Sequence, residues 1–390
     1  MLDLLSTRLE KIRAAGLYRS LRTVDRTTPR VSVAGETALL FCSNNYLGLA
    51  EHPVLAQAAA EAALYYGTSS AASRLVSGSN PLHNRLETQL AAWKGTETAL
   101  LFNSGYAANT GVIAALAGKG DIIFSDRLNH ASIVDGAFLS GAKLVRYPHN
   151  DLAVLERLLE RYRTAGLRLI VTDGVFSMDG DCAPLTGLAA LAEAHQALLM
   201  VDDAHGSGVL GVQGKGSADL YGVTSRVAVL MGTFGKALGS YGAYVACPVP
   251  VREYLINRAR SFVFSTSLPP AVLAASSAAI DLVCSEEGEQ LRVRVTENGR
   301  LLRTLLQQAG FSVPDGSTPI VPLVVGEADC VVEFSTRLLE RGIFVQGIRP
   351  PTVPQGTSRL RCTVMASHTS DHIREAATII AAVGRDLGVI

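Results

Sequence analysis

One lysine stands out among the side chains that could do covalent chemistry. Lys236, one of six lysines in the chain, follows the apolar run at 227–232 and lies in the segment TFGKALG at 233–239. Ligands of α/β sheets bind beyond the carboxyl ends of the strands, where this lysine is expected. A lysine that forms a Schiff base needs a lowered pKa and an unhindered approach, for which the glycines leave room. Taken alone, the segment could equally hold an ordinary loop lysine.

A carboxylate and a histidine end a second apolar run. Asp202 and His205 lie in VDDAH at 201–205, 34 and 31 residues before Lys236. Pyridoxal phosphate (PLP), a cofactor held by a Schiff-base lysine, needs a carboxylate that keeps its ring nitrogen protonated. Asp202 could meet that need, and His205 could contact the ring. A lone motif of this kind is more often a helix or turn cap beside a buried histidine. The number of residues between Asp202 and Lys236, however, allows one intervening strand, so both motifs can line one crevice.

A phosphate seat is expected at the segment SGYAAN, residues 104–109. Here a strand passes through Gly105 and Tyr106 into a helix, which leaves unpaired backbone N–H groups at the positive end of the helix dipole. Thr233, three residues before Lys236, offers a hydroxyl to the same phosphate. A simple helix cap is the alternative.

Two more loops that follow apolar runs carry polar groups. His130, in SDRLNHAS at 125–132, could stack on a flat cofactor or act as an acid near the substrate. Ser177, in GVFSMDGD at 174–181, is the expected cofactor contact of its loop. Each loop alone has a structural explanation, but five such loops together with one lysine favour a single PLP site.

The elements that must position these residues alternate along the chain. Short apolar runs bounded by turns indicate buried parallel strands, and segments of helical periodicity between them indicate helices on both faces of a sheet. The fold class is therefore α/β with a large, mostly parallel sheet. Strands are expected at 99–102, 121–125, 143–147, 168–173, 198–203, 227–232 and 243–248, and helices at 53–66, 82–93, 106–116, 131–139, 152–162 and 185–195.

A chain of 390 residues is too long for one compact core. We expect an N-terminal helix with a short strand pair in residues 1–45, a large cofactor-binding domain at 46–265, and a smaller C-terminal α/β domain at 266–390. The smaller domain should begin with a long helix from Ala271 to about Gln308 and end with a helix at His372–Leu387.

Composition excludes several classes of protein. The 35 basic and 35 acidic residues cancel, which argues against partners such as nucleic acid or an anionic membrane. The six cysteines lie far apart, without the spacing of a disulfide framework or a zinc site, and no metal is expected. No signal peptide or spanning segment is visible, so a cytoplasmic location is expected. The glycines at 206–211 match G-x-G-x-x-G, but they do not directly follow a strand, which argues against a dinucleotide site.

Six segments, in order, resemble the α-oxoamine synthases. They are SNNYLGL (43–49), SGYAAN, SDRLNHAS, GVFSMDGD, VDDAHGSGVLG (201–211) and TFGKALG, and the resemblance spans about residues 15–385. It implies a fold-type-I PLP-dependent transferase that acts as a homodimer. The chain is most similar to the subgroup of biotin biosynthesis that joins L-alanine to a pimeloyl thioester, on CoA or a carrier protein, and releases the thiol and carbon dioxide. The segment IRPPTVP at 348–354 also resembles that subgroup.

The resemblance also implies roles for single residues. Lys236 would tether the cofactor and act as general base, Asp202 would hold the ring nitrogen, and His130 would lie over the ring and contact the substrate. Cofactor contacts are expected from Gly105, Tyr106, Ser177, His205 and Thr233.

Further residues are expected to bind the substrates. Arg361 would hold the amino acid carboxylate as a two-pronged donor, with a surface strand arginine as the alternative. Arg19 and Thr352 would meet the acyl substrate, with Arg22 competing with Arg19. Thr266 would reach the cofactor phosphate of the partner chain.

Three other functions remain open. The chain could be another α-oxoamine synthase, such as one that joins glycine to acetyl-CoA. It could be a plain aminotransferase, or a non-catalytic subunit of the same fold. The joint presence of Lys236, Asp202 and His205 argues against the last.

Overall fold

The computed structural model describes residues 2–390 and divides the chain into two compact units. The first unit comprises the N-terminal residues up to Tyr46, the short segment Met178–Gly180 and the C-terminal part Arg294–Ile390. The second unit comprises Leu47–Ser177 and Asp181–Val293.

The second unit is built on a seven-stranded sheet with the order β3-β9-β8-β7-β6-β4-β5. β9 runs antiparallel to β3 and β8, and the remaining neighbours are parallel, which confirms the expected mostly parallel sheet. The strands are β3 (Thr98–Phe102), β4 (Ile122–Asp126), β5 (Lys143–Tyr147), β6 (Arg168–Asp173), β7 (Leu198–Asp202), β8 (Val229–Thr233) and β9 (Ala243–Cys247).

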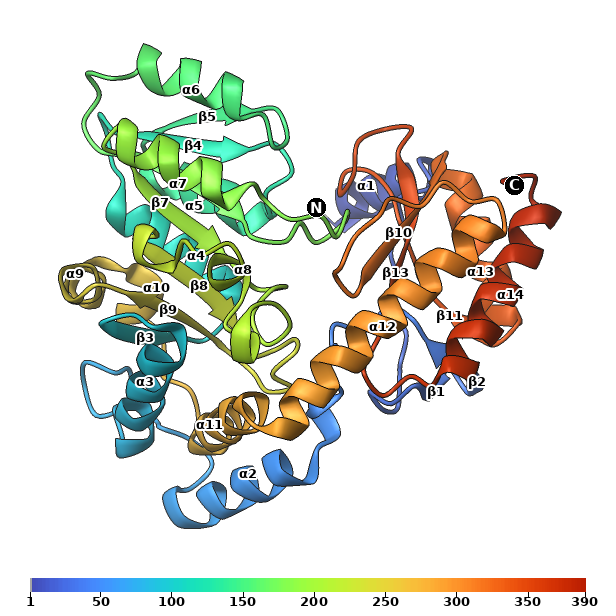
Figure 1. The fold of residues 1–390 in the computed structure, drawn as a ribbon, viewed down its shortest axis with the longest axis horizontal. Coiled ribbons are helices and arrows are strands. Elements are labelled where there is room, and N and C mark those ends of the chain that lie inside the picture. Colours follow the sequence, from blue (N-terminus) through green and yellow to red (C-terminus); the bar gives the residue numbers. More distant parts are fainter. Residues whose placement is uncertain (1) are drawn as a thin grey trace. The chain divides into compact units, whose positions relative to one another are not determined.

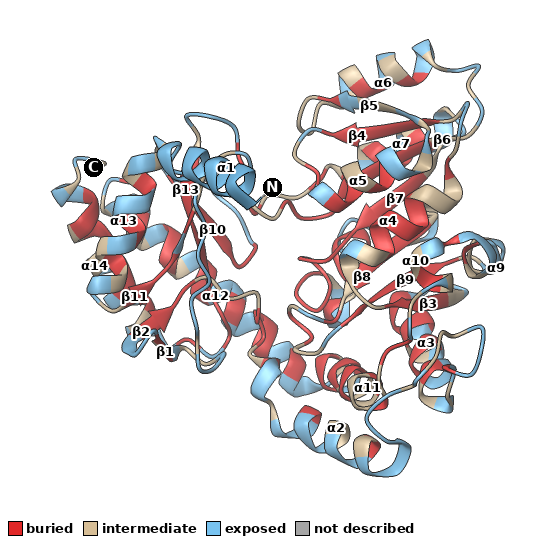
Figure 2. Cartoon of the chain, turned by 180° about the vertical axis from the view of Figure 1, so that it is seen from behind, coloured by how far each residue is buried: buried red, intermediate tan, exposed pale blue. Residues whose placement is uncertain are grey.

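Helices cover both faces of this sheet (Figure 1). One face shares a core with α4, α5, α9 and α10, in which alternate strand residues such as Leu169 and Val171 are fully buried. α6 and α7 lie on the other side, and most strand residues are buried (Figure 2). These helices are α4 (Gly105–Leu116), α5 (Ala131–Ser140), α6 (Leu152–Arg161), α7 (Leu185–Ala194), α9 (Val249–Arg258) and α10 (Arg260–Val263).

The end of the second unit differs from the expected boundary at residue 265. The helix α11 (Pro270–Cys284) packs against α2 (Pro53–Tyr66) and α3 (Pro81–Lys94), so the unit continues to Val293. The expected long helix is two helices, because Ser285 adopts an extended conformation and its hydroxyl caps α12 (Glu286–Gln308) by accepting a hydrogen bond from the Gly288 N–H. The short α8 (Ser217–Leu220) completes the helices of this unit.

The N-terminal residues are not a separate domain but part of the first unit. β1 and β2 form the expected hairpin, and β2 then pairs in parallel with β11, about three hundred residues later. β10, β12 and β13 form a second, antiparallel sheet. The elements are α1 (Leu2–Ala14), β1 (Arg30–Val33), β2 (Glu36–Leu40), β10 (Ile320–Gly326), α13 (Ala328–Glu340), β11 (Ile343–Phe344), β12 (Gln346–Ile348), β13 (Ser358–Thr363) and α14 (Ser370–Asp386). Across residues 2–390, none of the helices combines the length and apolar character needed to cross a membrane.

Candidate active site

The strand ends of the second unit open into a cavity of about 190 Å³. All eight residues expected to contact the cofactor line it: Gly105, Tyr106, His130, Ser177, Asp202, His205, Thr233 and Lys236. Their roles remain predictions, but the structure brings them together from five loops that are far apart in sequence. Asn109, Ser132 and Asp173 also line the cavity.

Asp202 is the last residue of β7 and is only 5% exposed. Its Oδ2 accepts a hydrogen bond from Asn109 Nδ2 at 2.7 Å, and its Oδ1 accepts one from the Ala204 N–H at 3.0 Å. Two donors stabilise a buried carboxylate, as burial requires. Asp202 is therefore a fixed anionic acceptor in the cavity wall, which is what a protonated ring nitrogen would need.

Lys236 lies in the turn that follows β8 and is half-buried. Its Nζ is 2.8 Å from Nε2 of His205. The two glycines beside it do different things. A Cβ on Gly235 would make only ordinary contacts, with Thr233 Oγ1 at 3.6 Å and a more distant carbonyl. A Cβ on Gly239, whose φ is +61°, would lie 2.4 Å from the Leu49 carbonyl carbon, so glycine is needed there for packing.

His130 caps the N-terminus of α5. Its backbone N–H donates to Asp173 Oδ2 at 3.1 Å, and its Nδ1 lies 2.7 Å from Ser132 Oγ. Loss of water around the ring lowers the pKa of His130, although the charge of Asp202 acts in the opposite direction. The imidazole is therefore neutral near neutral pH and can donate through one nitrogen only.

The expected phosphate seat lies at the first turn of α4. The Ser104 hydroxyl accepts from the Ala107 N–H at 3.1 Å, which leaves the N–H groups of Gly105 and Tyr106 without acceptors inside the helix. The Tyr106 hydroxyl donates to Asp135 at 2.6 Å, so this residue offers its backbone rather than its phenol. The Thr233 hydroxyl donates to the Gly242 carbonyl at 2.8 Å, and a phosphate would have to replace that acceptor.

Asp173 is a site residue to which sequence reasoning gave no role. It ends β6 in register with Asp202 on β7, and it is 4% exposed. Burial, and then the nearby charge of Asp202, raise the pKa of Asp173 well above its ordinary value. Two carboxyl groups side by side at this edge disfavour having both in the charged form, and the cost falls on Asp173.

Asn109 and Ser132 were also missed. Asn109 lies four residues after Gly105, one helical turn along the same face of α4, and this spacing is the signal that could have found it. Ser132 lies two residues after His130, in the first turn of α5.

The expected substrate residues lie in the first unit. Arg19 and Thr352 line one hollow of about 680 Å³ together with Arg22 and Arg349, so both arginines proposed for the acyl substrate are present there. Arg361, on β13, is 8% exposed and is not the surface arginine considered as its alternative. Its guanidinium donates to Asn44 Oδ1 and to the Tyr46 hydroxyl, both at 3.2 Å.

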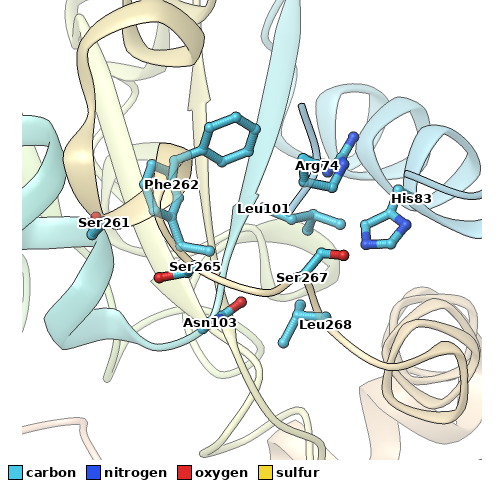
Figure 3. Close-up of a pocket in the computed structure, with 10 residues that line it drawn as sticks. Arg74, His83, Leu101, Asn103, Ser261, Phe262, Ser265, Ser267 and Leu268 are labelled. Atoms are coloured by element: carbon cyan, nitrogen blue, oxygen red, sulfur yellow. The ribbon is translucent and has the colours of Figure 1, made fainter. Parts of the chain in front are cut away.

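A smaller hollow in the second unit is lined by Ser265 and Ser267, the neighbours of Thr266 in the sequence (Figure 3). The Thr266 carbonyl accepts from Asn103 Nδ2 at 2.7 Å. His83 and Asn103 are also among the residues that line this hollow. Its volume of about 10 Å³ admits roughly one water molecule, so it cannot hold a cofactor.

The glycines at 206–211 lack the structural setting of a dinucleotide site. After Gly211 comes a single 3₁₀ turn, Val212–Gly214, instead of the helix that a dinucleotide site requires. In the described part of the chain, no group of three His, Cys, Asp or Glu side chains could hold a metal ion.

Comparisons with known proteins agree with this geometry. Residues 36–380 match the family model "Aminotransferase class I and II". An 8-amino-7-oxononanoate synthase from Trichlorobacter lovleyi is 74% identical over 100% of both chains, and one from Geobacter sulfurreducens is 60% identical over 98% of both.

Two solved structures share the fold of this chain. A serine palmitoyltransferase from S. paucimobilis, with a PLP–myriocin adduct bound, matches with a TM-score of 0.94 and 32% identity over 100% of this chain and 98% of that one. An 8-amino-7-oxononanoate synthase from Francisella tularensis matches with a TM-score of 0.78 and 29% identity over 90% of this chain and 98% of that one.

Proposed function

The chain belongs to the class I and II aminotransferase family, and we propose that it is a PLP enzyme that condenses L-alanine with a pimeloyl thioester. The products are 8-amino-7-oxononanoate, carbon dioxide and the free thiol, in biotin biosynthesis. The observation that carries this proposal is the 74% identity, over the whole of both chains, to a relative of that name. The similarity in fold to a serine palmitoyltransferase does not favour that activity instead, because the sequence identity to it is only 32%.

The residues of the cavity fit PLP. Lys236 offers an amine for covalent attachment, Asp202 a buried anionic acceptor, and Gly105 and Tyr106 two backbone N–H groups at a helix start. When bound, PLP supplies an electron-poor ring that absorbs the charge left by removal of an α-proton. Asp202 would keep the ring nitrogen protonated, which strengthens that effect.

Different residues of the cavity would carry out the remaining steps. Lys236 would take the α-proton of L-alanine as general base, because its amine lies in the same cavity. His130, neutral and held at the N-terminus of α5, would donate a hydrogen bond to the substrate carboxylate or ketone. Ser177 and His205 would contact the cofactor ring, and Thr233 its phosphate.

Further residues would bind the ends of the substrates. Arg361 would hold the alanine carboxylate, since a guanidinium can donate two parallel hydrogen bonds to it. Arg19 or Arg22, with Thr352, would meet the acyl substrate. Both arginines line the same hollow, which supports a shared anion-binding site there.

We further propose that the enzyme is a cytoplasmic homodimer in which Thr266 reaches the partner's cofactor phosphate. Three large apolar side chains of the second unit, Leu64, Phe138 and Phe264, are 70–89% exposed. Such exposure supports their burial against a second copy of the chain. The six cysteines are free thiols, as is usual in a reducing compartment. Light scattering tests the dimer: a mass of one 41.2 kDa chain would contradict it.

A panel of substrates tests the reaction. Purified PLP-loaded protein is given L-alanine, glycine or L-serine together with pimeloyl-CoA, a pimeloyl carrier protein, acetyl-CoA or palmitoyl-CoA, and thiol release is measured. We expect turnover with L-alanine and a pimeloyl thioester. Turnover with glycine and acetyl-CoA alone would transfer the assignment to a glycine C-acetyltransferase, and keto-acid exchange without thiol release would indicate a plain aminotransferase.

A further inference from the structure

Asn109 connects two of the residues that the proposed function uses. It lies on α4, is 1% exposed, and has both of its amide hydrogens directed at acceptors. Asn109 Nδ2 donates to Asp202 Oδ2 at 2.7 Å and to Ser132 Oγ at 2.8 Å. Its Oδ1 is buried and has no hydrogen-bond partner among residues 2–390.

The hydrogen bonds beyond Ser132 have a fixed direction. The Ser132 N–H points at Nδ1 of His130 at 3.3 Å, which marks this nitrogen as an acceptor but is too long to hold the ring firmly. Ser132 Oγ accepts from Asn109 and can therefore direct its own hydrogen to the same Nδ1, 2.7 Å away. The proton of the neutral His130 ring must then lie on Nε2, which makes Nε2 the donor of this residue.

We propose that Asn109 is a positioning residue that fixes the carboxylate of Asp202 and, through Ser132, the tautomer of His130. This inference rests on the proposed function, because it assigns Asp202 to the cofactor and His130 to the substrate. One amide thereby couples cofactor binding with orientation of the substrate donor.

The unpartnered oxygen argues that the amide is present for its two hydrogens. A buried amide oxygen without a donor destabilises the folded chain, and an apolar side chain of similar size would avoid that cost. The two N–H groups, in contrast, reach two residues of the cavity at short distances. The amide therefore acts on two residues of the cavity wall, and its own oxygen is left without a partner in the described residues.

The first test measures PLP affinity, without turnover. Cofactor-free wild type, Asn109→Ala, Asp202→Asn and the double variant are titrated with PLP and followed by absorbance. Thr110→Val is the matched control, because its buried hydroxyl donates to carbonyls of its own helix. We expect Asn109→Ala to weaken PLP binding about tenfold, since a hydrogen bond to a charged group is lost. The control should stay within about twofold of wild type.

The double variant shows whether Asn109 acts through Asp202. If it does, Asn109→Ala adds no more than about a twofold loss once Asp202 has been replaced. Independent losses that multiply would overturn the proposal, as would wild-type PLP affinity in Asn109→Ala. Failure of the wild type itself to bind PLP would instead refute the proposed function.

Ser132→Ala tests the connection from Asn109 to His130 separately from the connection to Asp202. It remains informative if Asn109→Ala does not fold. It removes the hydroxyl that lies between Asn109 and His130 but leaves the bond from Asn109 to Asp202. PLP affinity should stay within about twofold of wild type, while kcat falls about tenfold with little change in KM. Equal losses of PLP affinity and kcat, or no loss of either, would contradict the tautomer role.

Discussion

The amine of Lys236 lies 2.8 Å from Nε2 of His205, so two of the eight residues expected to contact the cofactor also contact each other. This hydrogen bond orients the lysine toward the cavity. We predict that His205→Ala, by removing it, lowers kcat by about tenfold to a hundredfold and weakens PLP binding. Steady-state kinetics and PLP titration measure both effects. His195→Ala, on the C-terminal cap of α7, is the control. Unchanged values in His205→Ala would show that the contact has no functional role.

The pKa of His130 should lie below the ordinary histidine value of 6.5, because burial of its ring disfavours the charged form. Its proton should therefore be gained only as the pH falls further than for an exposed histidine. An NMR titration of histidine ring resonances in the cofactor-free protein measures this, with His130→Asn to assign the signal. A midpoint at or above 6.5 would contradict the prediction.

Lys94 forms a buried ion pair with Asp203, which lies two residues before His205. Their charged atoms are 3.5 Å apart, and both side chains are at most 2% exposed. Burial lowers the pKa of Lys94, but Tyr244 and Asp203 outweigh it and raise the pKa overall, so the ammonium stays charged.

Replacement of Lys94 by Met leaves a buried carboxylate without its cation. We predict a loss of about 3–5 kcal/mol in the free energy of unfolding, measured with urea. Lys94→Met combined with Asp203→Asn should cost less than the sum of the single changes. The exposed Lys119→Met is the control. Additive losses would show that the pair does not act as a unit.

His149 joins three strand-end loops. Its Nδ1 lies 3.1 Å from Asp126 Oδ1 and its Nε2 lies 2.8 Å from Asp181 Oδ2, and its ring packs edge-on against Phe176. Burial lowers the pKa of His149, but the hydrogen bonds to the two carboxylates outweigh it and raise the pKa to about 10. The ring is therefore charged at neutral pH.

A raised folded-state pKa fixes the direction of the pH effect. The stabilisation by His149, about 2 kcal/mol, should be complete below pH 6.5, decline as the pH rises, and be lost near pH 10. Urea unfolding of wild type and His149→Gln at several pH values tests this. The difference between them should shrink with rising pH, and a difference that grows would contradict the assigned charge.

Local pattern was sufficient to predict most of the second unit. Each apolar run expected as a strand is one, because a strand buried on both faces needs a continuous apolar sequence, as in RLIVTD at β6. Asp202, at the end of one run, and Lys236, in the turn after another, could be assigned to one edge of the sheet because parallel strands end at the same edge.

The features that the sequence pattern did not predict depend on contacts between residues that are distant in the chain. The pairing of β2 with β11 and the packing of α11 on α2 leave no local signal, so the domain boundaries were misplaced. The spacing of Asn109 from Gly105 could place it on the cavity side of α4, but only the 2.7 Å distance to Asp202 shows what its amide does.

The most direct measurement is mass spectrometry of protein reduced with borohydride after loading with PLP. Reduction makes the link between cofactor and lysine permanent, so digestion and sequencing locate it. We predict that the label lies on Lys236 and that Lys236→Ala loses both the label and turnover. A label on another lysine, or turnover that survives in Lys236→Ala, would contradict the account.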